Sequence, residues 1–173
     1  DSANKIYEID EHIIASVAGI VSDARILIER SQVLAQQHRV TYDSPIEPHL
    51  IIKEIANIMQ QFTQYGGARP FGVALMIAGV QDKTPMLYAS DITGNYFSYH
   101  ANAIGERDDR IKDLLREKYK KDLDIKGGVK LALDILKEVQ GNKFDIKRFE
   151  LGYIKIRERL KKVEGENLRE FVK

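Results

Sequence analysis

The sequence predicts an α+β layered sandwich, a fold in which layers of helices cover antiparallel sheets. The expected elements come in blocks: two strands, two helices, three strands, two helices, then further strands and a last helix. Blocks of this kind argue against a parallel sheet that alternates with single helices. Of the 173 residues, 43% are hydrophobic and 31% are charged, which is typical of a soluble globular protein. This length predicts one domain, residues 1–173, with a sizeable core.

The first block is expected to contain two short strands and a long helix. Residues 6–9 and 13–17 are mostly apolar, and the polar turn 10–12 separates them. From Ile20 the apolar residues take a helical spacing that continues to about His38. We therefore expect a hairpin followed by a helix.

A second helix is expected to begin near Glu47, because Pro48 suits the first turn of a helix. Five apolar residues recur on one side of it, namely Ile51, Ile55, Ile58, Met59 and Phe62. Gly66 and Gly67 should stop this helix, since glycine tolerates the left-handed conformation that closes one.

The middle block predicts three strands. Residues 73–80 are nearly all apolar, which indicates a strand that is buried on both faces. Residues 85–89 should form the next strand. Residues 96–104 should return as its partner after a loop in which Gly94 supplies a positive φ angle.

The last third predicts two more helices and a late pair of strands. Asp108 or Asp109 should cap the third helix, and Asp124 should open the fourth. Residues 149–156 and 159–163 read as strands, and 166–172 as a short terminal helix.

Composition excludes several classes of function. Lys and Arg number 27 against 26 Asp and Glu, so no global field attracts nucleic acid or an anionic membrane. No apolar run approaches the length of a membrane span. The absence of Cys excludes a thiolate site and is compatible with the cytoplasm. The four histidines are scattered, so we expect no metal site and no cofactor.

Residues 60–75, QQFTQYGGARPFGVAL, closely resemble a signature of proteasome alpha subunits, and archaeal ones match best. Residues 5–10, 19–25 and 101–105 agree with the same family in the same order. The resemblance implies the N-terminal nucleophile hydrolase fold, a four-layer sandwich of helices, two antiparallel sheets and helices. It also implies a gate tail, a helix and two strands before Lys5. The sequence begins at Asp1, so we expect a fold that is incomplete at its N-terminus.

The resemblance also implies a docking pocket. In the family, the lysine that matches Lys5 lies between adjacent subunits and pairs with the C-terminal carboxylate of a regulatory ATPase, through a charge-assisted hydrogen bond. Gly19, Ile20 and Val21 would line the same pocket. An ordinary surface lysine and simple core packing remain the alternatives at these positions.

Four residues of the long signature are interpreted as structural. Gly66 and Gly67 allow a sharp turn, and Pro70 holds Arg69 in an extended conformation. Arg69 would then act as a local tether or in an ion pair between subunits, and not in an active site.

Catalysis by this fold needs an N-terminal Thr, Ser or Cys whose free amine serves as the base. Asp1 is none of these, and Ser2 does not precede the family's first strand. The resemblance therefore implies a non-catalytic subunit, seven copies of which form a ring that caps a ring of beta subunits, gates substrate entry and docks the ATPase. Two alternatives stay open: an active threonine-type peptidase subunit, and a free binding or assembly module.

Overall fold

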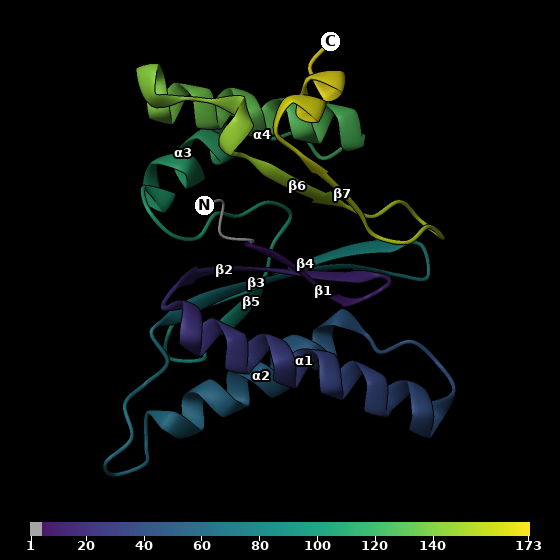
Figure 1. Ribbon diagram of the computed structural model, residues 1–173, viewed down its shortest axis with the longest axis vertical. Helices are drawn as coiled ribbons and strands as arrows, with labels where there is room; N and C mark the ends of the chain where they lie inside the picture. Colours follow the sequence, from purple (N-terminus) through teal and green to yellow (C-terminus); the bar gives the residue numbers. More distant parts are fainter. Residues whose placement is uncertain (1–4) are drawn as a thin grey trace.

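The protein, described here for residues 5–173 by a computed structural model, is built of four layers (Figure 1). Helices α1 (Val21–Tyr42) and α2 (Pro48–Phe62) form one outer layer, and α3 (Asp108–Lys118) and α4 (Ile125–Gln140) form the other. Two antiparallel sheets lie between them. The predicted fold class, a helix–sheet–sheet–helix sandwich, is confirmed.

The larger sheet has five strands in the order of the sequence, each antiparallel to its neighbour. They are β1 (Ile6–Asp10), β2 (Ile13–Gly19), β3 (Val73–Gln81), β4 (Thr84–Ser90) and β5 (Tyr96–Ser98). The smaller sheet pairs β6 (Glu150–Tyr153) with β7 (Lys161–Glu164). Three short 3₁₀ helices complete the chain, namely η1 (Gly141–Lys143), η2 (Ile146–Arg148) and η3 (Gly165–Phe171).

The main core lies between the five-stranded sheet and the α1–α2 layer. The apolar stripe of α2 faces this core, because Ile51, Ile55 and Met59 are fully buried. From the sheet, Leu75 and Ile77 are buried against the helices. Alternate residues of a strand point to opposite faces, so β3 sends every second side chain into the core.

Helix α1 continues to Tyr42, about one turn beyond the predicted end at His38. Its inner side is buried at Leu27, while its outer side exposes Ile26, Val33 and Val40, which recur every seven residues. A seven-residue repeat places side chains along one face of a helix. The outer surface of the α1–α2 layer therefore carries an apolar stripe.

Two strand predictions need correction. β3 is not buried on both faces, because its buried residues alternate with partly exposed ones. The two-stranded sheet lies over part of the second face and contacts the larger sheet at β1 and β2, where Gly152 approaches Ile6 and Ile14. The predicted strand 96–104 is also wrong in length, since β5 ends at Ser98 and residues 99–104 leave the sheet toward α3.

The helix caps agree only in part with those predicted from the sequence. Asp124 caps α4 as predicted, and its side chain accepts a hydrogen bond from the Gly127 amide at 2.7 Å. The cap position of α3 is instead Arg107, with a φ of 59° and no side-chain cap. Asp108 lies within the first turn and binds Lys112 at 2.7 Å.

No helix formed by residues 5–173 is both long enough and apolar enough to cross a membrane.

Candidate functional site

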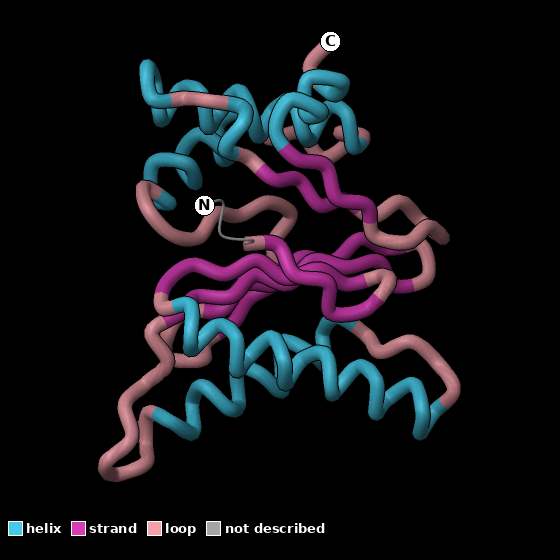
Figure 2. Tube along the Cα trace, viewed as in Figure 1, coloured by secondary structure: helices cyan, strands magenta, loops and turns pink. Residues whose placement is uncertain are grey.

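The predicted site residues meet at one end of the five-stranded sheet, where β2 ends, α1 begins and the chain from α2 enters β3 (Figure 2). Gly19 pairs with Val73 in the last position of the β2–β3 ladder. Ile6 pairs with Ser16, so the start of β1, which Lys5 precedes, lies beside this same end of β2. The structure thus brings Gly19, Ile20 and Val21 together with the end of the long signature, at Gly72 and Val73, while Lys5 lies at the same end of the sheet.

Gly19 is required by the close approach of two backbone segments. Its φ is 131°, and a Cβ atom at this position would lie 2.1 Å from the carbonyl oxygen of Gly72. The amide of Ile20 donates to that same oxygen at 2.9 Å. Glycine here lets the start of α1 bind the end of the signature loop directly.

Asp23, in the first turn of α1, holds the signature loop by a bidentate ion pair. Arg69 donates from Nη1 to Asp23 Oδ2 at 2.6 Å and from Nη2 to Oδ1 at 2.8 Å. The Gly72 amide donates to Oδ2 at 2.8 Å. These bonds, that from Arg69 first, lower the pKa of Asp23 to about 2, because they stabilise the charged carboxylate.

The tip of the signature loop projects away from the rest of the molecule (Figure 2). Gly67 has a φ of 84°, and a Cβ atom at Gly66 or Gly67 would meet nothing within 4 Å. Tyr65 is exposed. The ion pair to Asp23 therefore fixes the loop at its base, while its tip is solvated.

Lys5, Ile20 and Val21 are all exposed, with Ile20 at 46% and Val21 at 68%. The Lys5 amide donates to Glu150 Oε2 at 3.4 Å. Its ammonium group has no ion-pair partner among the residues that the structure describes. Chemically, this end of the sheet carries an ammonium group that has no ion pair within residues 5–173, and exposed Ile20 and Val21 add apolar surface at the same end. Such an ammonium group can bind a carboxylate.

Sequence reasoning missed Asp23 and Gly72 as parts of this arrangement. An acid in the first turn of a helix usually indicates favourable interaction with the helix dipole, and nothing local connects Asp23 with an arginine 46 positions away. The prediction about a nucleophile at Asp1 or Ser2 lies outside the described residues. Among residues 5–173, no group of three His, Cys, Asp or Glu could hold a metal.

The chain matches the proteasome subunit family over residues 1–154. It is 39% identical to a proteasome subunit alpha of Methanosarcina thermophila, in an alignment that covers 99% of this chain and 70% of the relative. It is 41% identical to a proteasome subunit alpha of Archaeoglobus fulgidus with the same coverage. The alpha subunit of Pyrobaculum aerophilum is 47% identical over 78% of this chain and 56% of its own length.

These matches agree with the four layers of the fold and extend beyond the signature at residues 60–75 to nearly the whole chain. They also distinguish a non-catalytic alpha subunit from an active peptidase subunit, since each of these relatives is an alpha subunit. The chain therefore belongs to the proteasome subunit family, and within it to the alpha type, the non-catalytic component of the outer ring of the 20S core.

Proposed function

We propose that the chain is a single-domain, ring-forming subunit that gates entry of unfolded proteins in the cytoplasm and docks a regulatory ATPase. The observation that supports the docking role is that Lys5, Ile20 and Val21 are all exposed at the same end of the sheet. Seven copies would form the ring, and a ring of beta subunits would lie beneath it.

Lys5 supplies the charge that such docking needs. An ammonium group binds a chain-terminal carboxylate through short charge-assisted hydrogen bonds. Val21, at 68% exposure, offers apolar surface for the last side chains of the docked peptide. The Asp23–Arg69 pair keeps this end of α1 in a fixed position relative to the signature loop.

The outer surface of α1 suits contact with another ring. Ile26, Val33 and Val40 are exposed at 52%, 45% and 87%, and a row of apolar side chains in water marks an interaction surface. We assign this stripe to the contact with beta subunits, which leaves the Lys5 end free for the activator.

Replacement of Lys5 by Ala tests the docking role in the full-length protein assembled with beta subunits. Loss of a charge-assisted hydrogen bond should weaken binding of the regulatory ATPase at least about ten-fold. Stimulated peptide hydrolysis should fall, while the native mass of the particle stays unchanged. Lys130→Ala, an exposed lysine of α4, is the matched control.

Two results would contradict the proposal. Full stimulation of the Lys5→Ala particle would remove Lys5 from docking. A wild-type protein that stays monomeric by native mass spectrometry with beta subunits present would remove ring formation, and a free binding module would then describe the chain better.

A further inference from the structure

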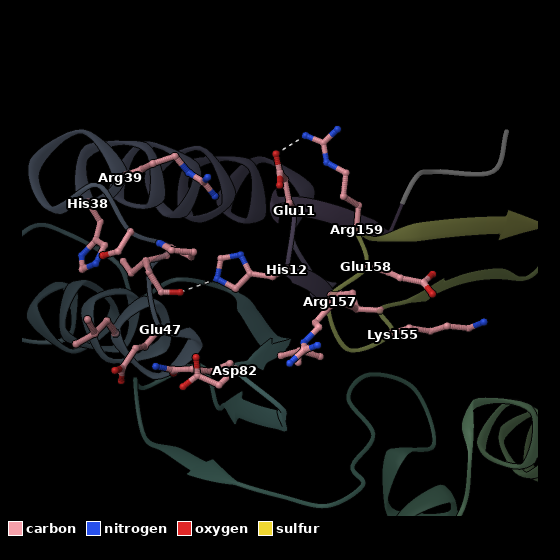
Figure 3. Close-up of a pocket in the computed structure, with 17 residues that line it drawn as sticks. Glu11, His12, His38, Arg39, Glu47, Asp82, Lys155, Arg157, Glu158 and Arg159 are labelled. Atoms are coloured by element: carbon pink, nitrogen blue, oxygen red, sulfur yellow. Dashed lines mark hydrogen bonds and ion pairs between the residues drawn. The ribbon is translucent and has the colours of Figure 1, made fainter.

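A cavity of about 550 Å³ lies at the end of the β1–β2 hairpin that is remote from Lys5 (Figure 3). It is open to solvent, and five segments line it: the β1–β2 turn, the last turns of α1, the segment that leads into α2, the β3–β4 turn and the loop 154–159. Its volume falls within the range of small-molecule sites. The cavity is separate from the docking end described above and belongs to no role proposed for the chain so far.

Several charges around this cavity are already neutralised. Arg39 binds Asp10 at 3.0 Å, Arg159 pairs with Glu11, and Glu158 accepts from Lys161 at 2.8 Å. Figure 3 shows Glu158 and Lys155 pointing away from the side on which Asp82 and Glu47 lie. These groups therefore do not supply free charge to the interior.

Four charged side chains of the lining have no hydrogen bond or ion pair within residues 5–173, and one of them, Lys155, points away from the acids of the cavity (Figure 3). The other three are Glu47, Asp82 and Arg157. Glu47 stands at the start of α2, Asp82 in the β3–β4 turn and Arg157 in the loop 154–159. Figure 3 shows Arg157 reaching from the opposite wall toward the side of the two acids. The cavity thus presents two free carboxylates and one free guanidinium.

The Gln81 side chain adds an unsatisfied acceptor to the same wall. Its Oε1 atom is buried and has no hydrogen-bond partner within the described part of the chain. A buried acceptor without a donor is costly and rare in folded proteins. Because this atom has almost no accessible surface, it does not face the space that a ligand would fill.

Arg157 has a φ of 65°, a region that side-chain-bearing residues other than Asn and Asp seldom occupy. The loop keeps a long cationic side chain at a position where glycine would relieve the backbone.

We propose that this cavity binds a short zwitterionic peptide. Its ammonium group would lie between Glu47 and Asp82, and its carboxylate would accept from Arg157. A simple cation or anion would satisfy only one sign of free charge, and no metal-binding group of three His, Cys, Asp or Glu exists within residues 5–173. A free amino acid has the same end groups, but the volume favours a longer ligand.

Isothermal titration calorimetry of the full-length protein tests this with triglycine, its N-acetylated form, its C-terminal amide and glycine. Triglycine should bind, and capping either end should weaken binding at least about ten-fold, because each cap removes one charged partner. Glycine should bind more weakly than triglycine. These comparisons use wild-type protein, so they do not depend on the folding of a variant.

Variants then assign the residues. Asp82→Asn and Arg157→Gln should each weaken triglycine binding at least about ten-fold, and Glu158→Gln, in the same loop but directed away, should leave it unchanged. Absence of triglycine binding at millimolar concentration would overturn the proposal, and so would equal binding of the capped forms. Glycine binding as tight as triglycine would replace the peptide by an amino acid.

Discussion

Asp23 is the most strongly held carboxylate at the docking end of the molecule. It accepts two hydrogen bonds from Arg69 and one from the Gly72 amide, and only 7% of its side chain is exposed. Arg69 is mostly exposed, so solvent weakens the charge–charge attraction between the two. The hydrogen bond from the Gly72 amide and the two directed hydrogen bonds from Arg69 therefore hold the loop more strongly than the charge–charge attraction does.

Asp23→Asn should lower the free energy of unfolding at neutral pH by ~1–2 kcal/mol, because it removes charged hydrogen bonds to an amide and a guanidinium. The pKa of Asp23 falls from 3.8 to about 2 on folding. The stabilisation is therefore complete above pH 3.8 and is lost as the pH falls through about 2.

Urea unfolding of wild type and variant between acid and neutral pH measures this difference. The two curves should converge as the pH approaches 2. Asp134→Asn, an exposed aspartate of α4, should change the free energy of unfolding by less than about 0.5 kcal/mol. A gap between wild type and Asp23→Asn that stays constant down to pH 2 would refute the assignment.

The role of a single residue could be predicted where its partner lies close to it in the sequence. Asp124 was identified as a helix cap because the bond that it accepts spans three positions. The partners of Asp23 were not, since the contact joins a helix start to a loop beyond the next helix. For the same reason no local signal marked Gln81 as an unsatisfied acceptor.

Replacing glycine by alanine should lower the stability of the protein at Gly19 and raise it at Gly128. Gly19→Ala should destabilise the protein, because the new Cβ would lie 2.1 Å from the Gly72 carbonyl oxygen and the φ of 131° is strained for alanine. Gly128→Ala should stabilise it by about 0.5–1 kcal/mol, because Gly128 lies within α4 and a Cβ there meets nothing within 4 Å. Thermal unfolding followed by circular dichroism distinguishes the two. Stabilisation by Gly19→Ala would show that the two segments can separate without cost.

The sequence predicted correctly whether a segment forms a helix or a strand, but it predicted the burial and the length of the strands less well. The stripe of α2 has a regular helical period, and its members Ile51, Ile55 and Met59 are buried as expected. An unbroken apolar run does not say how much of each face is covered, so β3 was predicted too deeply buried. The strand expected over 96–104 was predicted too long, because the chain leaves β4 after Ser98 although β4 extends back to Thr84. No local pattern of residues marks the point at which it leaves.

At the scale of the molecule, the exposed stripe of α1 should matter for assembly and not for folding. Ile26→Ser together with Val33→Ser should weaken association with beta subunits, because both side chains are about half exposed and contribute apolar surface to the contact. The free energy of unfolding should change little.

Native mass spectrometry of mixtures with beta subunits measures the association, and urea unfolding measures the stability. Leu123→Ser, an exposed apolar residue beside the opposite helix layer, is the matched control and should assemble normally. Normal assembly of the double variant would move the beta contact to another surface.

The overall architecture was predictable because the block order of elements and the signature at residues 60–75 point to the same four layers. The cavity at the remote end of the β1–β2 hairpin was not. It arises where five segments from residue 11 to residue 159 converge, and each segment alone resembles an ordinary solvated turn.

The contact between Ile20 and Gly72 closes a long excursion of the chain, since residues 21–71 leave the sheet after β2 and return to it at β3. Strands β3 and β4 are joined by a tight turn and can pair quickly. Pairing of β2 with β3 should be slower, because it must overcome the entropy of closing that excursion. We therefore expect the β3–β4 hairpin and the two helices to form first, and the backbone contact at Gly19 and the Arg69–Asp23 ion pair to form last, when β2 pairs with β3 and completes the sheet.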